Sequence, residues 1–319
     1  MPVSGMCKDN IRFMTNSTNV CKLRPFVKWA GGKGRLLSQL DANLPHFLYN
    51  VPKICYIEPF VGGGAMLFHM LNKFPNISSV VINDINEELI SCYRIIRNKP
   101  NSLLSLLKKI EDNFLPESQE VREEMFYAYR DEYNLKRHSL SDAKRCSLFI
   151  FLNRTCFNGL YRVNAKGDFN VPYGRYINPT ICDENTIKSV YDALNRVNIV
   201  IKSGDYKNVM TDIHNPAQTF VYLDPPYRPL LGEKNFQGYA KGPFSDRQQE
   251  ELRDFCNGLT ELGIRWMQSN SDSKNADGKS YFEELYDNND FQILYAPRAI
   301  NAFGQGRGKI TESLIRNYN

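Results

Sequence analysis

The sequence predicts an α/β protein whose open sheet is interrupted by an inserted helical segment. Short runs of β-forming residues alternate with helical patterns over the first hundred residues and again after residue 196. Several of the expected strands end at an acidic residue, which is typical of a ligand site at the carboxyl edge of a sheet. Between residues 100 and 195 the alternation stops, and three helical patterns follow one another.

The chain divides into three parts on this pattern. Residues 1–22 are polar and lack periodicity, so we expect a loose extension. Residues 23–99 and 196–319 are expected to form the sheet domain, and residues 100–195 an inserted subdomain. Strands are expected over residues 53–57, 80–83, 197–201, 219–223, 264–268, 290–295 and 311–318, and helices over residues 36–44, 65–74, 87–98, 100–112, 117–137, 141–153, 183–195 and 246–262.

Composition and charge narrow the class of protein. A chain of 319 residues, 42% of them hydrophobic, can bury a large core and is long enough for about two domains. The net charge of +5 is mild and does not by itself indicate nucleic acid. Residues 130–180 hold nine basic and four acidic residues, an excess equal to that of the whole chain.

Cysteine usage and hydropathy indicate the compartment. The eight cysteines are scattered, without a C-x-x-C pair or an adjoining histidine, so neither a zinc site nor a disulfide framework is predicted. We expect reduced thiols in a cytosol-like compartment. No apolar run approaches the roughly 18 residues of a membrane span, and the N-terminus lacks an apolar signal core. An intracellular protein without a membrane anchor is expected.

The first informative stretch, residues 26–35, is basic and rich in glycine. It contains Trp29 and Lys33 and precedes the expected helix 36–44. It is not a Walker A loop, because Leu36 stands where that loop needs a hydroxyl residue. Taken alone, the stretch is best explained as a basic turn before a helix.

A strand, a glycine-rich turn and a helix follow. The turn, residues 58–64, begins at Glu58 and will be called the glycine turn. Such turns let a ligand approach the backbone near a helix N-terminus. The dinucleotide fingerprint G-x-G-x-x-G fails at Leu67, so a nucleoside without phosphates fits better than a pyrophosphate.

The next strand ends at Asp84, about 20 residues past the glycine turn. α/β nucleotide sites place a carboxylate on ribose hydroxyls at that spacing, so ribose binding is the favoured role. Asp84 or Asn86 could also cap the following helix, and the two roles are compatible. Asp205 follows the strand 197–201 and could bind a base amino group, although helix capping explains it equally well.

The helices between residues 100 and 153 carry aromatic and leucine faces that indicate packing. Residues 153–176 then combine basic, amide and aromatic side chains around an expected turn, and will be called the hairpin segment. Arg and Asn bind base edges bidentately, and aromatic rings enter base stacks. DNA contact is favoured over an ordinary exposed hairpin because of the clustering and the local charge.

The strand 219–223 leads into Asp224, Pro225, Pro226 and Tyr227, which we call the proline corner. Neither proline can donate to a strand ladder, so the strand stops there. The corner presents a carboxylate, carbonyl groups and an aromatic face, which together suit a flat molecule carrying an amino group. Simple strand termination would explain a Pro-Pro pair alone, but not this whole combination so well.

The rest of the chain is expected to complete the sheet domain. Residues 228–243 form a candidate mobile loop over the site, and residues 301–308 a glycine-rich basic loop. Ser245 and Gln248 make a capping box for the helix 246–262. Four acids at one sheet edge could suggest magnesium, but two precede proline and Asp84 has ribose spacing, so we predict no metal.

Four stretches, in this order, resemble the Dam-type (D12 class, group alpha) DNA adenine-N6 methyltransferases. They are residues 26–33, 58–64, 82–86 and 224–227. The hairpin segment is similar to the recognition hairpin of that family. The resemblance covers nearly everything from residue 25 to 318 and implies a Rossmann-like methyltransferase sheet that binds S-adenosylmethionine, with the inserted subdomain recognising its target.

The resemblance also implies roles for individual residues. Catalysis would fall to the proline corner. The cofactor would be bound by Trp29, Lys33, Glu58, Phe60, Gly62, Gly64, Asp84, Asp205 and Asp224. Duplex DNA would be contacted by Lys28, Phe157, Asn158, Leu160, Arg162, Arg175 and Tyr176. Phe157 stands where some relatives have tyrosine, which should preserve stacking but lose a hydroxyl.

The implied reaction is methyl transfer to N6 of an adenine extruded from a short duplex site, with GATC as the leading sequence. A restriction-modification context with a cognate endonuclease is left open, and a monomer in the bacterial cytoplasm is expected. The alternatives are an RNA-adenine or protein-glutamine N-methyltransferase, a non-catalytic DNA-binding protein on the same fold, and a nucleotide hydrolase. The Asp in the corner and the hairpin segment argue against the first, the intact cofactor residues against the second, and the missing Walker lysine against the third.

Overall fold

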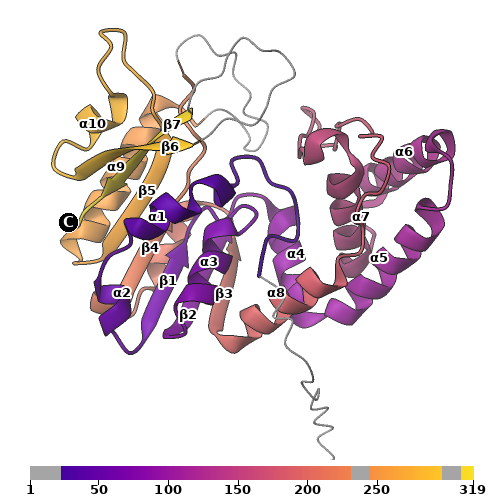
Figure 1. Ribbon diagram of the computed structural model, residues 1–319, viewed down its shortest axis with the longest axis horizontal. Helices are drawn as coiled ribbons and strands as arrows, with labels where there is room; N and C mark the ends of the chain where they lie inside the picture. Colours follow the sequence, from indigo (N-terminus) through magenta and orange to yellow (C-terminus); the bar gives the residue numbers. More distant parts are fainter. Residues whose placement is uncertain (1–22, 231–243, 297–309) are drawn as a thin grey trace, which may run out of the picture.

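The computed structural model describes residues 23–230, 244–296 and 310–319 (Figure 1). The expectations for residues 1–22, for most of 228–243 and for 301–308 lie outside these ranges. No helix in the described ranges is long and apolar enough to cross a membrane.

A seven-stranded sheet organises the described residues, with strand order β3-β2-β1-β4-β5-β7-β6 (Figure 1). Strands β3, β2, β1, β4 and β5 run parallel, whereas β7 is antiparallel to both β5 and β6. The strands are β1 Ile54–Glu58, β2 Ile77–Asp84, β3 Asn198–Ser203, β4 Thr219–Leu223, β5 Arg265–Ser271, β6 Asp290–Ala296 and β7 Ile310–Arg316. The predicted open, mostly parallel α/β sheet is therefore confirmed.

Both faces of the sheet are buried, which explains the nearly continuous apolar character of its central strands. Tyr56 and Phe220 pack into the core on one face. Ile57 and Val221, their neighbours along the two strands, pack into the core on the other face. All four side chains are inaccessible to solvent, and the two strands pair Tyr56 with Phe220 and Ile57 with Val221.

Helices cover the two faces. Buried residues of α3, α4 and α8 belong to the first core, and those of α9 and α10 to the second. The helices are α1 Leu37–Ala42, α2 Phe47–Asn50, α3 Ala65–Lys73, α4 Glu87–Asn98, α5 Pro100–Phe114, α6 Gln119–Lys136, α7 Asp142–Thr155, α8 Glu184–Arg196, α9 Asp246–Glu261 and α10 Tyr281–Leu285, with 3-10 turns η1 Lys33–Arg35, η2 Phe157–Gly159, η3 Tyr206–Asp212 and η4 Pro216–Gln218.

Helices α5, α6 and α7 pack on one another to one side of the sheet, and α7 also packs on α4 (Figure 1). Pro100 occupies the first turn of α5, where its missing N–H costs nothing. Helix α8 contacts α3, α4 and β3 as well as α5, and the first core runs without a break from the sheet into the helical region. The division at residues 99 and 196 stays a prediction.

Some element bounds differ from those predicted. Strand β5 continues through the polar Ser269, Asn270 and Ser271, because these residues pair with β7. The hairpin segment forms no extended ladder: its arms meet at two isolated bridges, Cys156 with Tyr173 and Val163 with Phe169. Its first arm begins as the end of α7 and a 3-10 turn, because polar residues there bind each other and the backbone.

Candidate active site

One cavity of about 480 Å³ lies at the carboxyl edge of the sheet. Strands β1, β2, β3 and β4 are parallel, so the residues that follow them meet at this edge. Every residue predicted for catalysis or cofactor binding lines the cavity, namely Trp29, Lys33, Glu58, Phe60, Gly62, Gly64, Asp84, Asp205, Asp224, Pro225, Pro226 and Tyr227. The volume falls within the roughly 300–1,000 Å³ typical of small-molecule sites.

The proline corner begins where the fully buried strand β4 ends. The Asp224 carboxylate lies 2.8 Å from the Lys33 ammonium and accepts a hydrogen bond of 3.1 Å from the Ser269 hydroxyl. The Ser269 oxygen also lies 2.9 Å from the hydroxyl of Tyr222. A lysine from the basic stretch and a serine from β5 thus fix one oxygen of Asp224.

A second carboxylate, Glu312 on β7, completes this cluster. Its Oε2 lies 3.6 Å from the Lys33 ammonium and accepts a hydrogen bond from the Tyr227 hydroxyl. Lys33 also donates to the Tyr227 oxygen at 2.5 Å, and its side chain is only 3% exposed. Two carboxylates therefore share one buried ammonium, and Tyr227 is tied to both charges.

Burial raises the pKa of Asp224 above its usual value, and the Lys33 ammonium opposes this rise most strongly. Burial likewise raises the pKa of Glu312, again opposed by Lys33. The ammonium therefore favours the ionised, acceptor form of Asp224 in a site that otherwise disfavours charge.

The glycine turn has the backbone geometry that its glycines permit. Gly62 and Gly64 have φ of 49° and 78°, in the left-handed region. A Cβ on Gly64 would lie 2.5 Å from the Tyr93 hydroxyl, and one on Gly62 would lie 2.9 Å from the Trp29 ring. Trp29 in turn stacks on Tyr161, with ring centroids 5.6 Å apart. The turn is packed too closely for any larger residue.

The acidic start of the glycine turn is deeply buried. Glu58 is 2% exposed and accepts a hydrogen bond of 2.8 Å from the Tyr56 hydroxyl. Burial raises the pKa of Glu58 well above its usual value, and the negative charges of Asp224 and Asp84 add to the rise. Nearby, the ring of Phe60 stacks on Tyr206 at 5.1 Å and forms an aromatic wall.

Asp84 organises the backbone between β2 and α4. Its two oxygens accept hydrogen bonds of 2.9 Å from the N–H groups of Gly62 and Asn86. Asn86 caps α4 by accepting from the Leu89 N–H. Asp205 caps η3 by accepting from the Lys207 N–H, so its capping alternative is confirmed while its side chain remains at the cavity.

The donor set at this edge was also tested against a metal ion. Within residues 23–230, 244–296 and 310–319, no three His, Cys, Asp or Glu side chains are arranged to hold one. Each carboxylate described above is instead engaged by protein N–H, hydroxyl or ammonium donors.

Lys28 lies at the junction of the basic stretch and the hairpin segment. Its ammonium is 4.5 Å from the centroid of the Tyr176 ring, and a Cβ on Gly159 would lie 2.3 Å from its side chain. Asn153 holds the Lys28 backbone through bonds of 2.8 Å to both its N–H and its carbonyl. The structure thus brings Lys28 and Tyr176 together beside η2.

The other predicted DNA contacts differ in exposure. Phe157 is 52% exposed, and Asn158 follows it with φ of 56°. Arg175 is also exposed, has φ of 50° and pairs with Glu123 of α6. Leu160 is half-buried against the core.

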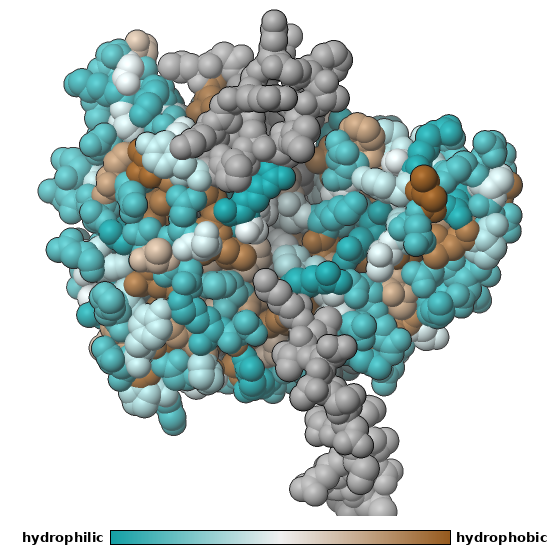
Figure 2. All heavy atoms as spheres, viewed as in Figure 1, coloured by the Kyte–Doolittle hydropathy of each residue, from teal (hydrophilic) through white to brown (hydrophobic). Residues whose placement is uncertain are grey.

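Arg162 is the predicted contact most engaged within its own segment. Its guanidinium donates to the Asn170 side chain at 2.8 Å and to the Asn170 carbonyl at 3.3 Å. On the face seen in Figure 2, hydrophobic residues are interspersed with polar ones over both the sheet and the helical region. Exposed side chains such as Phe157 are therefore distinguished by their place in the hairpin segment, not by a large apolar patch.

Comparison with known proteins identifies the family. The sequence profile of the D12 class N6 adenine-specific DNA methyltransferases matches residues 29–299. The chain belongs to this family. It is 45% identical to the Type II methyltransferase M.MjaIII of Methanocaldococcus jannaschii over 300 residues, covering 93% of this chain and 100% of the relative.

Two further relatives are similar over almost the whole chain. Identity is 38% to the Type II methyltransferase M1.LlaDCHI of Lactococcus lactis subsp. cremoris, covering 94% of this chain and 97% of the relative. It is 32% to the DNA adenine methylase of Escherichia coli K12, covering 92% and 95%. A solved rRNA methyltransferase from Streptomyces viridochromogenes aligns with 10% identity and a TM-score of 0.35, too low to support an argument.

The chain is thus a DNA adenine-N6 methyltransferase that uses S-adenosylmethionine. When bound, this cofactor supplies an electrophilic methyl group on a sulfonium. The cavity fits such a group: Glu58, Asp84, Asp205 and Asp224 offer carboxylates to hydroxyl, amino and cationic groups. Ile85, 59% exposed, adds an apolar side chain to the cavity next to Asp84.

Sequence reasoning missed Glu312, Ser269 and Ile85 as members of the site. Glu312 and Ser269 lie in strands that pair antiparallel, a partnership that no local pattern discloses. Ile85 carried a readable signal, because an apolar residue directly follows the acid at the end of a strand.

Proposed function

We propose that this methyltransferase acts on an adenine flipped out of a short duplex site, with GATC as the expected sequence. The carrying observation is that Asp224 lies inside the same cavity as the glycine turn and Asp84, with its side chain only 21% exposed. A base inside a duplex stack cannot reach a carboxylate buried in a cavity, so the adenine must leave the stack.

Asp224 and Pro225 would bind the target amino group. That group's lone pair is delocalised into the purine ring, so it is a poor nucleophile. The Asp224 carboxylate would accept one amino hydrogen and the Pro225 carbonyl the other, which favours the positive charge that develops on the nitrogen. Pro226 keeps the corner rigid, and the ring of Tyr227 would stack on the base. Alignment of the amine with the methyl group would contribute most of the remaining rate.

The cofactor would lie along the carboxyl edge of the sheet. Asp84 would bind the ribose hydroxyls, because each of its oxygens keeps acceptor capacity beside its backbone contact. Glu58 and the backbone of Gly62 and Gly64 would surround the methionine end, with Trp29 and Lys33 bordering it. Phe60 and Asp205 would close the side of the adenine moiety, where the aromatic wall lies.

The hairpin segment and Lys28 would hold the duplex. Lys28, Arg162 and Arg175 supply positive charge, and Asn158 supplies an amide for a base edge. The exposed ring of Phe157 and the side chain of Leu160 are suited to enter the stack, and Tyr176 lies against Lys28. Helices α5, α6 and α7 would serve as a target-recognition subdomain, within residues 100–195.

We further propose a monomer, acting alone or beside a cognate restriction endonuclease. The deciding experiment incubates the protein with tritium-labelled cofactor and duplexes with or without GATC, and then locates the methyl group. Label on adenine N6 in the GATC duplex alone is expected, and Asp224→Ala should abolish it while retaining the fold. Label in RNA or protein, or normal turnover by Asp224→Ala, would refute the proposal.

A further inference from the structure

The proline corner has an unusual anchoring problem. Pro225 and Pro226 have no N–H, so the peptide groups around Tyr227 can be held only through the Pro226 carbonyl and the Arg228 N–H. These two groups belong to the two peptide units that flank Tyr227. Whatever binds both of them fixes the backbone position of the Tyr227 ring.

Two buried amide side chains bind these groups. Gln249 of α9 donates to the Pro226 carbonyl at 3.2 Å, and the Arg228 N–H donates to the Asn270 oxygen of β5 at 3.2 Å. The two amides are joined to each other, because the Asn270 NH₂ donates to the Gln249 oxygen at 3.2 Å. Together they form a continuous bridge from one side of Tyr227 to the other.

The bridge occupies positions that packing alone would fill with apolar residues. Gln249 and Asn270 are both 0% exposed, and Gln249 lies on the same buried face of α9 as Leu252 and Cys256. A buried amide without partners costs free energy, so such a residue is expected only where its hydrogen bonds are made. The bonds it makes here are to the proline corner.

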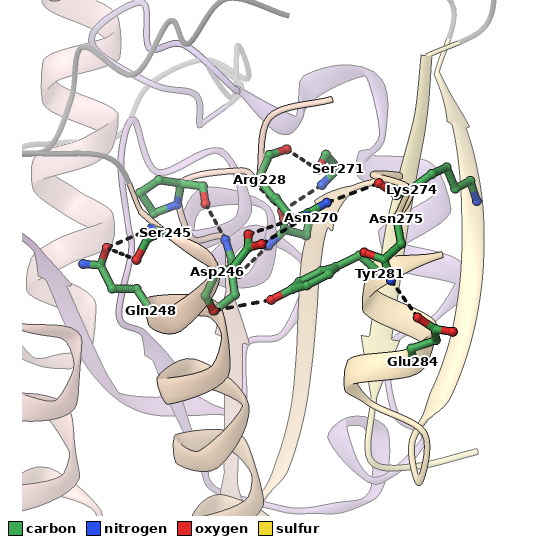
Figure 3. Close-up of polar contacts among 12 residues, drawn as sticks. Arg228, Ser245, Asp246, Gln248, Asn270, Ser271, Lys274, Asn275, Tyr281 and Glu284 are labelled. Atoms are coloured by element: carbon green, nitrogen blue, oxygen red, sulfur yellow. Dashed lines mark hydrogen bonds and ion pairs between the residues drawn. The ribbon is translucent and has the colours of Figure 1, made fainter. Parts of the chain in front are cut away.

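Neighbouring contacts hold the exit of the corner in the same way (Figure 3). The Ser271 hydroxyl donates to the Arg228 carbonyl at 2.6 Å. The Arg228 guanidinium pairs with Asp246 at 2.7 and 3.0 Å and lies 4.0 Å from the centroid of the Tyr281 ring. Arg228 therefore joins β5, the first turn of α9 and α10.

We propose that the Gln249–Asn270 amide bridge positions Tyr227 for methyl transfer. Gln249 and Asn270 are positioning residues, since they act through the backbone of the proline corner. The role rests on the proposed function, in which the Tyr227 ring stacks on the extruded adenine. With the bridge broken, the ring and the neighbouring Pro225 carbonyl lose their fixed geometry, so kcat falls while cofactor affinity is retained.

The test compares Gln249→Glu with Gln249→Leu. A protonated glutamic acid can still donate to the Pro226 carbonyl, whereas the carboxylate and leucine cannot. Burial should raise the pKa of the introduced acid, so its loss of donation falls at neutral to alkaline pH. Glu250→Gln, on the exposed face of the same helix, is the matched control for an amide–carboxyl exchange.

We measure kcat on the methylated duplex at saturating cofactor from about pH 6 to pH 9, the cofactor Kd, and the folded fraction by circular dichroism. Gln249→Leu should lower kcat about tenfold or more at every pH, with cofactor Kd within about twofold. Gln249→Glu should approach the wild-type kcat near pH 6 and fall towards the leucine variant near pH 9. The control should follow the wild type throughout.

A folded Gln249→Leu protein with wild-type kcat would overturn the bridge, and so would a kcat loss that merely follows the folded fraction. A Gln249→Glu profile parallel to the wild type would also overturn it. Failure of the proposed function is a separate result, because it is read from the wild-type enzyme on GATC and control duplexes.

Discussion

Replacing Lys33 with methionine tests the electrostatics of the active site. The Lys33 ammonium lies 2.8 Å from Asp224 and 3.6 Å from Glu312, with its side chain almost fully buried. Removing one partner of a buried ion pair costs about 3–5 kcal/mol, because the other charge is left uncompensated. Protonation of the carboxylate limits that cost, and at about 1.4 kcal/mol per unit the pKa of Asp224 should rise by about two units.

The expected result follows from the sign of that change. Asp224 must be ionised to accept the amino hydrogen, so the acid limb of the pH–rate profile should move about two units to higher pH in Lys33→Met. The assay is single-turnover methyl transfer at saturating cofactor across the pH range. Lys108→Met, which removes an exposed lysine paired on α5, is the control and should leave the profile unchanged. A rate lowered equally at every pH would refute the reasoning, since Lys33 would then act through binding alone.

Three other substitutions test separate parts of the structure. Glu58→Gln should be more stable than the wild type at neutral pH and converge with it on acidification: the folded pKa of Glu58 is raised, so the folded state holds more protons and the free energy of unfolding falls as pH rises; thermal melts from about pH 4 to 8 check this, and equal slopes would contradict it. Gly64→Ala should lower the free energy of unfolding by about 1–3 kcal/mol, because the residue has φ of 78° and its Cβ would meet Tyr93, whereas Gly258→Ala within α9 should be neutral or stabilising by up to about 1 kcal/mol; denaturant titration measures both, and an unaffected Gly64→Ala would contradict the cited clash. Lys28→Ala should weaken duplex binding and reduce the slope of log K against log salt by about one; the exposed Lys188→Ala should leave that slope unchanged, and an equal slope in both variants would remove Lys28 from the DNA interface.

Local patterns were enough to predict most of the secondary structure. Helix α4 spans the predicted residues 87–98, because Asn86 caps it and a clear apolar face continues to its end. The capping box of Ser245 and Gln248 opens α9 as expected. Such signals lie within a few residues of each other, so they can be read before any tertiary contact is known.

The predictions were weaker where neighbours in space decide the structure. Strand β5 was expected to end at residue 268, but pairing with β7 carries it through Ser271. The hairpin segment was expected to have two extended arms, and the structure has two isolated bridges with a 3-10 turn. In both places polar residues find partners that are distant in sequence.

The sequence by itself determined the strand ends that carry Glu58, Asp84, Asp205 and Asp224, because an acid after an apolar β-rich run is a local pattern. It also predicted that they would meet, since parallel strands share a carboxyl edge. Only the tertiary structure decided what surrounds them. Glu312, Gln249 and Asn270 reach the proline corner across an antiparallel pairing and a helix packed on the sheet, and the energetics of a buried charge or amide depend on such partners.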